Sequence, residues 1–210
     1  MVGAGVEREQ RAVERRRTGC AAPAASVLGV LLVVAATERE LALLDGFETF
    51  CCGIGPVEAA LQTARALQDR RPDAVVHAGI AGSRTLEPPA LVLGSEAVYC
   101  DVIDPASTLP RVERVRPDAS LLQTARAALP AAHVLPIATC GKVGGGTGFD
   151  VEAMEGFGVL RACELAGVPA VEIRAISNEL AEGDRSRWRI GRALEALADV
   201  VPGVLEAAAK

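Results

Sequence analysis

The chain alternates between short, mostly apolar runs and longer stretches in which apolar and polar residues repeat with a helical period. Short apolar runs are typical of strands buried in a sheet, and amphipathic stretches are typical of helices that cover it. Strands are expected at residues 30–36, 47–52, 73–83, 91–102, 133–140 and 170–177. Helices are expected at residues 38–44, 57–70, 119–129, 152–167 and 185–201. This alternation predicts an α/β fold with a mostly parallel central sheet and helices on both of its faces.

The N-terminal residues 1–26 are charged and then rich in Ala and Pro, without a sustained apolar stripe. We therefore expect a disordered tail, followed by one domain over residues 27–210. The segment "SVLGVLLVVAATERE" superficially resembles a signal peptide, because arginines precede an apolar run and small residues. A strand followed by a helix that is capped at Thr37 is the favoured interpretation. No apolar run reaches the roughly 20 residues of a membrane span.

Composition narrows the class of ligand. Half of the 210 residues are hydrophobic but only 3% are aromatic, so Ala, Val and Leu must build the interior. The net charge of −5 argues against a general nucleic-acid surface and favours a small metabolite. The six cysteines form no C-x-x-C pair and are expected to be reduced thiols of a cytosolic protein. His77 and His133 are the only histidines and lack ligand spacing, so no metal site is expected.

Three glycine clusters, "GAG", "GIGPVE" and "GKVGGGTG", are weak matches to phosphate-binding loops. Glu58 stands where a dinucleotide fingerprint needs its third glycine, and the last cluster does not lead into a helix through G-K-[ST]. Structural turns explain these glycines better. A nucleotide-dependent oxidoreductase or an NTPase is therefore poorly supported.

The last apolar strand, "AVEIRAIS", ends on Ser177 and Asn178. In an open α/β sheet, ligands bind just outside the carboxyl ends of the strands. A carboxamide at this point can donate a hydrogen bond to a ligand, whereas the ordinary alternative is an Asn that caps a turn. The residue is therefore a candidate ligand contact.

Several segments, taken in order, resemble the purine nucleoside phosphorylase/nucleosidase superfamily. The matching segments are "ATERELALL", "GIGPVEAA", "HAGIAGS" and "AMEGFGVLRACELAGVPAVEIRAISN". Within that superfamily, "RAISN…GDRSRWRIGRAL" is most similar to the futalosine hydrolases, nucleosidases of menaquinone biosynthesis. The resemblance implies a three-layer phosphorylase/hydrolase-like fold with a twisted, mostly parallel sheet. It also implies hydrolysis of the N-glycosidic bond of futalosine with release of hypoxanthine, without a metal or an organic cofactor.

The resemblance also implies roles for individual residues. Glu40 corresponds to the glutamate that activates water, with Glu38 as a shifted alternative and a solvated helix acid as the ordinary one. Glu155 corresponds to the glutamate that holds the ribose hydroxyls, and Met154 to the methionine that lines the pocket. Asn178 is expected to support a departing 6-oxopurine, because an amide can donate to O6 or N7 but cannot act as an acid.

The remaining substrate contacts expected from the resemblance come from turns and strand ends. They are Ile54, Ala81, Gly82, Val143 and Ser177. Two neighbouring polar residues are given structural interpretations, His77 as a core residue and Glu152 as a solvated acid.

The chain is shorter than the family pattern in two places, between Glu40 and "GIGP" and between "ATCGKV" and "AMEG". A nucleoside-binding protein without turnover is therefore one alternative. A methylthioadenosine/adenosylhomocysteine nucleosidase and a 6-oxopurine phosphorylase are the others, although a carboxylate in "ATERE" would repel phosphate. By resemblance, the protein is expected to be a homodimer with a purine nucleoside substrate. Its charge, its cysteines and its short apolar runs predict a cytoplasmic protein without a nucleic-acid or membrane partner.

Overall fold

A computed structural model of the chain describes residues 29–44, 46–102, 104, 106, 108–144 and 146–210. The strands are β1 (Leu31–Ala35), β2 (Glu48–Cys51), β3 (Ala74–Ser83), β4 (Leu91–Tyr99), β5 (Arg114–Val115), β6 (His133–Thr139), β7 (Val151–Ala153) and β8 (Ala170–Glu179). The helices are α2 (Glu38–Leu41), α3 (Pro56–Arg70), α4 (Ala119–Ala128), α5 (Gly156–Ala166) and α6 (Ile190–Ala208), with a 3₁₀ turn at Arg185–Arg187.

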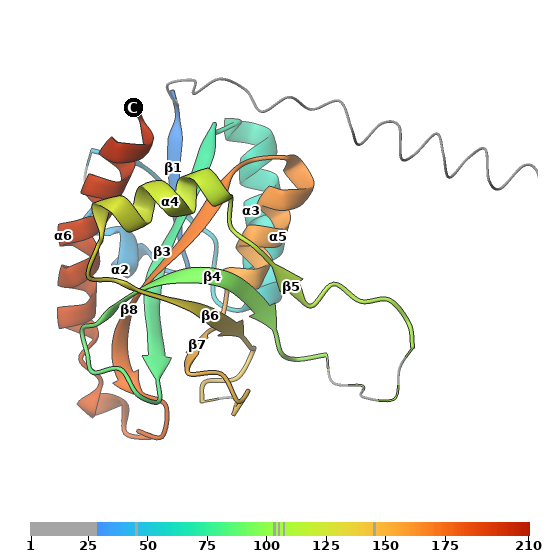
Figure 1. The fold of residues 1–210 in the computed structure, drawn as a ribbon, viewed down its shortest axis with the longest axis vertical. Coiled ribbons are helices and arrows are strands. Elements are labelled where there is room, and N and C mark those ends of the chain that lie inside the picture. Colours follow the sequence, from blue (N-terminus) through green and yellow to red (C-terminus); the bar gives the residue numbers. More distant parts are fainter. Residues whose placement is uncertain (1–28, 45, 103, 105, 107, 145) are drawn as a thin grey trace, which may run out of the picture.

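The eight strands form one strongly curved sheet (Figure 1). Strands β3, β8, β4, β6 and β7 pair in succession, and β7 returns to β3, so that these five strands close into a ring. Strands β1 and β2 extend the sheet from β3, and β5 is added to β4. Five of the eight pairings are parallel, namely β1 with β2, β1 with β3, β3 with β8, β4 with β6 and β6 with β7. The sheet is thus mixed, and mostly parallel as predicted.

Helices cover the sheet from two sides, which confirms the predicted α/β architecture. Helices α3 and α5 pack against each other on one side, and α4 and α6 pack together on the other (Figure 1). The larger core cluster lies under α4 and α6, and a second cluster lies under α3 and α5. Aliphatic side chains and alanines dominate both clusters, in agreement with the low aromatic content.

Helix boundaries follow from local sequence. Thr37 caps α2 with a capping box, in which its side chain accepts from the Glu40 N–H and Glu40 bonds back to the Thr37 N–H. Gly55 precedes Pro56 with φ 93°, a conformation that favours glycine, and lets α3 begin sharply. Gly167 ends α5 in the left-handed conformation with φ 71°.

Three predicted helices have different boundaries in the structure. The helix expected at 38–44 ends at Leu41. The helix expected at 152–167 begins only at Gly156, because residues 151–153 form strand β7 between β3 and β6. The helix expected at 185–201 starts at Ile190, after the 3₁₀ turn, and continues to Ala208. The strand expected at 91–102 ends at Tyr99.

The tail predicted at residues 1–26 lies outside the described residues, and the domain range 27–210 stays a prediction. The first apolar run does form strand β1, as the βα interpretation predicted. No helix within the described ranges is long and apolar enough to cross a membrane.

Candidate active site

A cavity of about 280 Å³ opens where β1, β3 and β8 end, beside the start of α5. This is the edge at which ligands of α/β proteins are expected. All nine predicted site residues line this one cavity: Glu40, Ile54, Ala81, Gly82, Val143, Met154, Glu155, Ser177 and Asn178. The structure therefore brings together side chains that are up to 138 positions apart in the chain, from Glu40 to Asn178.

Glu40 is held in place by three hydrogen bonds. Its Oε2 accepts from the Thr37 N–H at 2.9 Å and from the Thr37 hydroxyl at 2.8 Å, and its Oε1 accepts from the Ile80 N–H at 3.2 Å. A carboxylate offers about four lone-pair sites, so one acceptor position has no donor among the described residues. The remaining position on Oε1 is available to a ligand or a water molecule.

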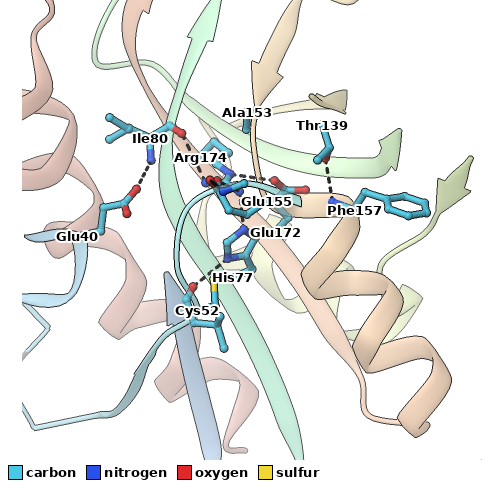
Figure 2. A network of polar contacts seen from close by, with 12 residues as sticks. Glu40, Cys52, His77, Ile80, Thr139, Ala153, Glu155, Phe157, Glu172 and Arg174 are labelled. Carbon is cyan, nitrogen blue, oxygen red and sulfur yellow. Dashed lines mark hydrogen bonds and ion pairs between the residues drawn. The ribbon is translucent and has the colours of Figure 1, made fainter. Parts of the chain in front are cut away.

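The buried side chain of Arg174 lies at the centre of a network of polar contacts that includes Glu155, Glu172 and His77 (Figure 2). The Arg174 guanidinium is 0% exposed, and its Nε donates to Oε1 of Glu172, also 0% exposed, at 2.8 Å. Its Nη2 lies 3.8 Å from Oε2 of Glu155, and its Nη1 donates to the Ile80 carbonyl at 3.5 Å. Arg174 thus connects Glu155 to Ile80, the residue whose N–H holds Glu40.

His77 completes this network as a neutral acceptor. Burial, with the nearby Arg174 charge, keeps the pKa of His77 well below its usual range. Its Nδ1–H donates to the Val34 carbonyl at 2.9 Å, which leaves Nε2 to accept from Arg174. The expectation that His77 is a core residue is correct, and the residue also positions Arg174.

Glu155 precedes the first residue of α5, and the turn that starts α3 holds its side chain. Its Oε1 accepts from the Gly55 N–H at 3.0 Å. Gly158 allows the two helix ends to approach, because a Cβ there would lie 2.5 Å from the Pro56 carbonyl oxygen. Burial raises the pKa of Glu155, although Arg174 and the Gly55 N–H act in the opposite direction. The "GIGP" turn, expected to be structural, therefore holds a cavity carboxylate.

Asn178 follows an irregularity in β8. Ala81 pairs with Ile176 but Gly82 pairs with Asn178, so Ser177 is an extra residue and forms a bulge. The Ser177 hydroxyl lies 2.8 Å from Oδ1 of Asn178, and Nδ2 of Asn178 donates to the Glu179 carbonyl at 2.9 Å. The second N–H of this amide has no acceptor among the described residues, so it is available to a ligand.

Two interpretations of neighbouring acids can be compared with the structure. Glu38 is exposed and does not line the cavity, whereas Glu40 does. The expectation that Glu152 is solvated is wrong, because the residue belongs to buried strand β7 and is only 5% exposed. The cavity wall also includes residues that sequence reasoning did not select, among them Arg39, Cys140, Lys142, Ala153, Trp188 and Leu194.

Removal of the Glu172 charge should change how stability depends on pH. Burial raises the pKa of Glu172, with Arg174 opposing, so the folded state binds its proton more tightly than the unfolded state. Such a group stabilises the fold below its unfolded pKa of about 4.3, and this contribution is lost as pH rises through the raised pKa.

We therefore expect wild type to lose stability relative to Glu172→Gln as pH rises from about 4 to 8. Urea denaturation across this range measures the difference. The exposed Glu206→Gln is the matched control and should show no such trend. A constant difference for Glu172→Gln would contradict the assignment.

Gly79 provides a steric test of the cluster. A Cβ at this position would lie 2.9 Å from Oε1 of Glu40 and in hard contact with the Arg174 guanidinium. Gly79→Ala should displace both groups and lower the turnover of a substrate about 100-fold, the typical effect of a shift near 1 Å. Gly203→Ala, where the added methyl would meet no atom within 4 Å outside its chain neighbours and the backbone of its own helix, should leave turnover unchanged in the same assay.

The sequence of the chain is similar to those of known proteins. Residues 49–210 match the profile of the family described as the phosphorylase superfamily. The chain is 37% identical over 188 residues to futalosine hydrolase from Streptomyces coelicolor, across 76% of this chain and 78% of that protein. A shorter segment of 58 residues is 43% identical to futalosine hydrolase from Thermus thermophilus, across 28% of this chain and 26% of that protein.

Solved structures share the fold. A mutant of futalosine hydrolase from Helicobacter pylori superposes with a TM-score of 0.78 at 18% identity, covering 85% of this chain and 99% of that chain. A 5′-methylthioadenosine/S-adenosylhomocysteine nucleosidase from Colwellia psychrerythraea, in complex with adenine, superposes with a TM-score of 0.76 at 22% identity, covering 86% and 96%. Because these sequence identities are low, the structural similarity shows a shared fold and nothing about function.

Proposed function

Because the chain belongs to the phosphorylase superfamily, we propose that it is a nucleosidase that hydrolyses the N-glycosidic bond of futalosine and releases hypoxanthine. The observation that carries the proposal is the 37% identity to a futalosine hydrolase across most of both chains. The meeting of two carboxylates and one carboxamide in one cavity supports it. The reaction would serve menaquinone biosynthesis.

Cleavage of an N-glycosidic bond places positive charge on the ribose ring and negative charge on the departing base. An enzyme gains rate by stabilising that separated charge better than it stabilises the substrate. The site therefore needs a base for the attacking water, an anion near the ribose and a hydrogen-bond donor near the purine.

Glu40 supplies the base for water. Thr37 and the Ile80 N–H fix its carboxylate, and the remaining acceptor position on Oε1 takes one hydrogen of the water. As the water attacks the anomeric carbon, Glu40 receives its proton. The proton acceptor is thus oriented before the substrate arrives.

Glu155 holds the ribose. The Gly55 N–H and Arg174 occupy part of its carboxylate, and the rest can accept hydrogen bonds from the 2′- and 3′-hydroxyls. Its negative charge also favours the cation that develops on the ring. Met154 and Ile54 provide apolar walls beside it.

Asn178 supports the leaving base. Ser177 fixes its Oδ1 side, and the second N–H of the amide donates to O6 or N7 of the 6-oxopurine. Gly82, next to it, lets the Leu180 and Asn178 side chains approach β3, because a Cβ there would lie 2.6 Å from Cδ2 of Leu180 and 3.1 Å from Nδ2 of Asn178. The amide thereby stabilises the negative charge on hypoxanthine as it leaves.

Water is the proposed nucleophile in preference to phosphate. The two cavity carboxylates, Glu40 and Glu155, would repel a phosphate dianion, and the Arg174 guanidinium is fully buried against Glu172. Arg39 also lines the cavity, and its positive charge could attract phosphate. Turnover should therefore be measured with and without phosphate.

The direct test is incubation with futalosine, inosine and methylthioadenosine, each with and without phosphate, with chromatography of the released base. Hypoxanthine released from futalosine without a phosphate requirement is the expected result. Cleavage of methylthioadenosine but not futalosine would identify the other nucleosidase class. Hypoxanthine-nucleoside binding in calorimetry without released base would identify a binding protein that lacks turnover.

The proposal also includes a homodimer located in the cytoplasm. The start of α3 exposes the apolar side chains of Ile54, Val57 and Leu61, which are 63%, 66% and 64% exposed. Ile54 also lines the cavity, so this surface adjoins the active site. Light scattering after gel filtration should give twice the chain mass, and Leu61→Glu should shift it toward the monomer. A monomeric wild type would contradict this part of the proposal.

A further inference from the structure

Strands β4 and β6 are each followed by a cysteine whose thiol has no part in the proposed mechanism. The two strands pair in parallel as far as Tyr99 and Thr139, and their ends lie next to each other (Figure 1). Cys100 and Cys140 therefore occupy the next position of the same register. The Cys100 N–H donates to the Thr139 carbonyl at 2.9 Å, as a parallel pairing of the two cysteines requires. Both thiols are free.

The separation expected from this register suits a disulfide. Neighbouring strands are about 4.8 Å apart, and disulfides join residues whose Cα atoms are about 4.4–6.8 Å apart. Residues at the same register position point to the same face of a sheet, so the two thiols share one face. The turns that follow them are also joined, because the Gly141 N–H donates to Oδ2 of Asp101 at 2.8 Å. The two cysteines are thus held close together by the backbone around them.

Neither thiol is fixed by a strong hydrogen bond. Sγ of Cys100 donates to the Val98 carbonyl at 3.4 Å, and Sγ of Cys140 donates to the Lys142 carbonyl at 3.2 Å. A thiol is a weak donor, so these contacts do little to prevent the two side chains from turning toward each other.

The adjacent thiols of Cys51 and Cys52 are a poorer pair. Consecutive Cα atoms are about 3.8 Å apart across a trans peptide, which is shorter than the usual span of a disulfide. Cys163 lies within helix α5 and belongs to the core under α3 and α5. Among the cysteines that the structure describes, Cys100 and Cys140 therefore have the most suitable geometry.

Exposure sets the order in which the two thiols would react. Cys100 is partly exposed and does not line the cavity, whereas Cys140 is 3% exposed and lines it. An oxidant from solution therefore meets Cys100 first. Burial raises the pKa of both thiols, so both are mostly protonated at neutral pH and react slowly.

We propose that Cys100 and Cys140 are a site of reversible oxidation, at which a low-molecular-weight disulfide converts them into a disulfide that slows turnover in the cavity. The Cys100 thiolate attacks one sulfur of the oxidant, whose S–S bond breaks and releases one thiol. The Cys140 thiolate then attacks the Cys100 sulfur of the mixed disulfide and releases the second thiol. Two protein thiols are oxidised, one small disulfide is reduced, and the two protons pass through solvent to the released thiols. The bond itself is independent of the proposed function, and only its effect on turnover rests on that function.

The disulfide would change the wall of the cavity. An S–S bond of about 2.05 Å draws Sγ of Cys140 toward Cys100 and away from the Lys142 carbonyl. Residues 142–144 line the cavity and lose this contact. Turnover of futalosine should fall about tenfold, less than the factor of about 100 that a 1 Å shift of a catalytic group costs.

The experiment incubates the full chain with oxidised glutathione and follows intact mass, a peptide map and turnover. The expected product is a peptide that joins Cys100 to Cys140, with a mass loss of about 2 Da and about tenfold lower turnover, and dithiothreitol should reverse both. Cys100→Ser keeps a donor for the Val98 carbonyl, so its turnover should lie within about twofold of wild type and should not respond to the oxidant. Cys51→Ala removes a thiol that does not line the cavity and should respond as wild type does.

A glutathione adduct that stays on Cys100, or a cross-link between any other two cysteines, would overturn the proposal. A bond between Cys100 and Cys140 that left turnover unchanged would overturn its effect on the cavity. If the reduced chain did not cleave futalosine but the bond formed, the proposed function would be wrong and the thiol pair would stand. Calorimetry with hypoxanthine would then test the cavity, and weaker binding by the oxidised chain is the expected result.

Discussion

Replacement of Glu40 by glutamine is expected to lower kcat on futalosine about 1000-fold, with a change in substrate binding of less than about threefold. General-base catalysis typically contributes a factor of about 10² to 10⁴, and an amide cannot take a proton from water at neutral pH. Glutamine keeps an oxygen for Thr37, so the cap of α2 and the fold should persist. Steady-state kinetics and calorimetry with futalosine measure the two effects separately.

Glu38→Gln is the matched control for this substitution. Glu38 lies on the same short helix and carries the same charge, but it is exposed and does not line the cavity. Its replacement should leave kcat within about twofold of wild type. Equal rates for wild type and Glu40→Gln would remove Glu40 from the mechanism, and a large loss in Glu38→Gln would point to the shifted alternative.

The longer elements of the fold are predictable from the apolar pattern because each buries a continuous stripe. Strand β3, with nine of its ten residues buried, is the clearest example. Strands β5 and β7 were not predicted, since two or three residues are too few to show a period. Their existence depends on pairing with distant strands, and β7 is what closes the ring of strands.

Glu40, Glu155 and Asn178 were expected to share one cavity because of the family resemblance, and not because of their spacing in the sequence. The sequence also contains a signal of the buried network behind the cavity. The buried strand "AVEIRAIS" holds Glu172 and Arg174 two positions apart, so both side chains point to the same face of β8. Charges inside an apolar strand are rare unless they are paired, and this pair marks the buried network behind the cavity.

Glu152 illustrates the opposite difficulty. Its sequence context, one helical turn before Glu155, suggested the solvated start of a helix. The residue is buried because β7 pairs with β3 and β6, and these contacts lie far away in the chain. Local pattern cannot reveal such pairing, so the burial of Glu152 could not be predicted from its neighbours in the sequence.

In the network around Arg174, one positive charge lies among several carboxylates, so the fold is expected to depend on the arginine. Glu172, Glu155 and Glu40 all act on Arg174, and His77 beside it is neutral. Burial alone would lower the pKa of Arg174, but the combined charges of Glu172 and Glu155 outweigh it and raise that pKa. One cation thus compensates several carboxylates, of which that of Glu172 is fully buried.

Replacement of Arg174 by methionine should therefore lower the free energy of unfolding by about 3–5 kcal/mol, the usual cost of leaving a buried charge without its partner. Methionine fills much of the volume, so loss of charge and not a cavity is the main effect. Turnover should also fall, because the guanidinium no longer fixes Glu155 or the Ile80 carbonyl. Urea denaturation and futalosine kinetics measure these two losses.

The double variant Arg174→Met/Glu172→Gln distinguishes charge compensation from packing. If the cost comes from the uncompensated carboxylate of Glu172, its neutralisation should restore part of the stability that Arg174→Met loses, and the two substitutions should be strongly non-additive. Turnover should stay low in the double variant, since Glu155 still lacks its cation. Additive losses of stability would show that Arg174 acts through packing alone, and the account of a charge-compensating network behind the cavity would then be wrong.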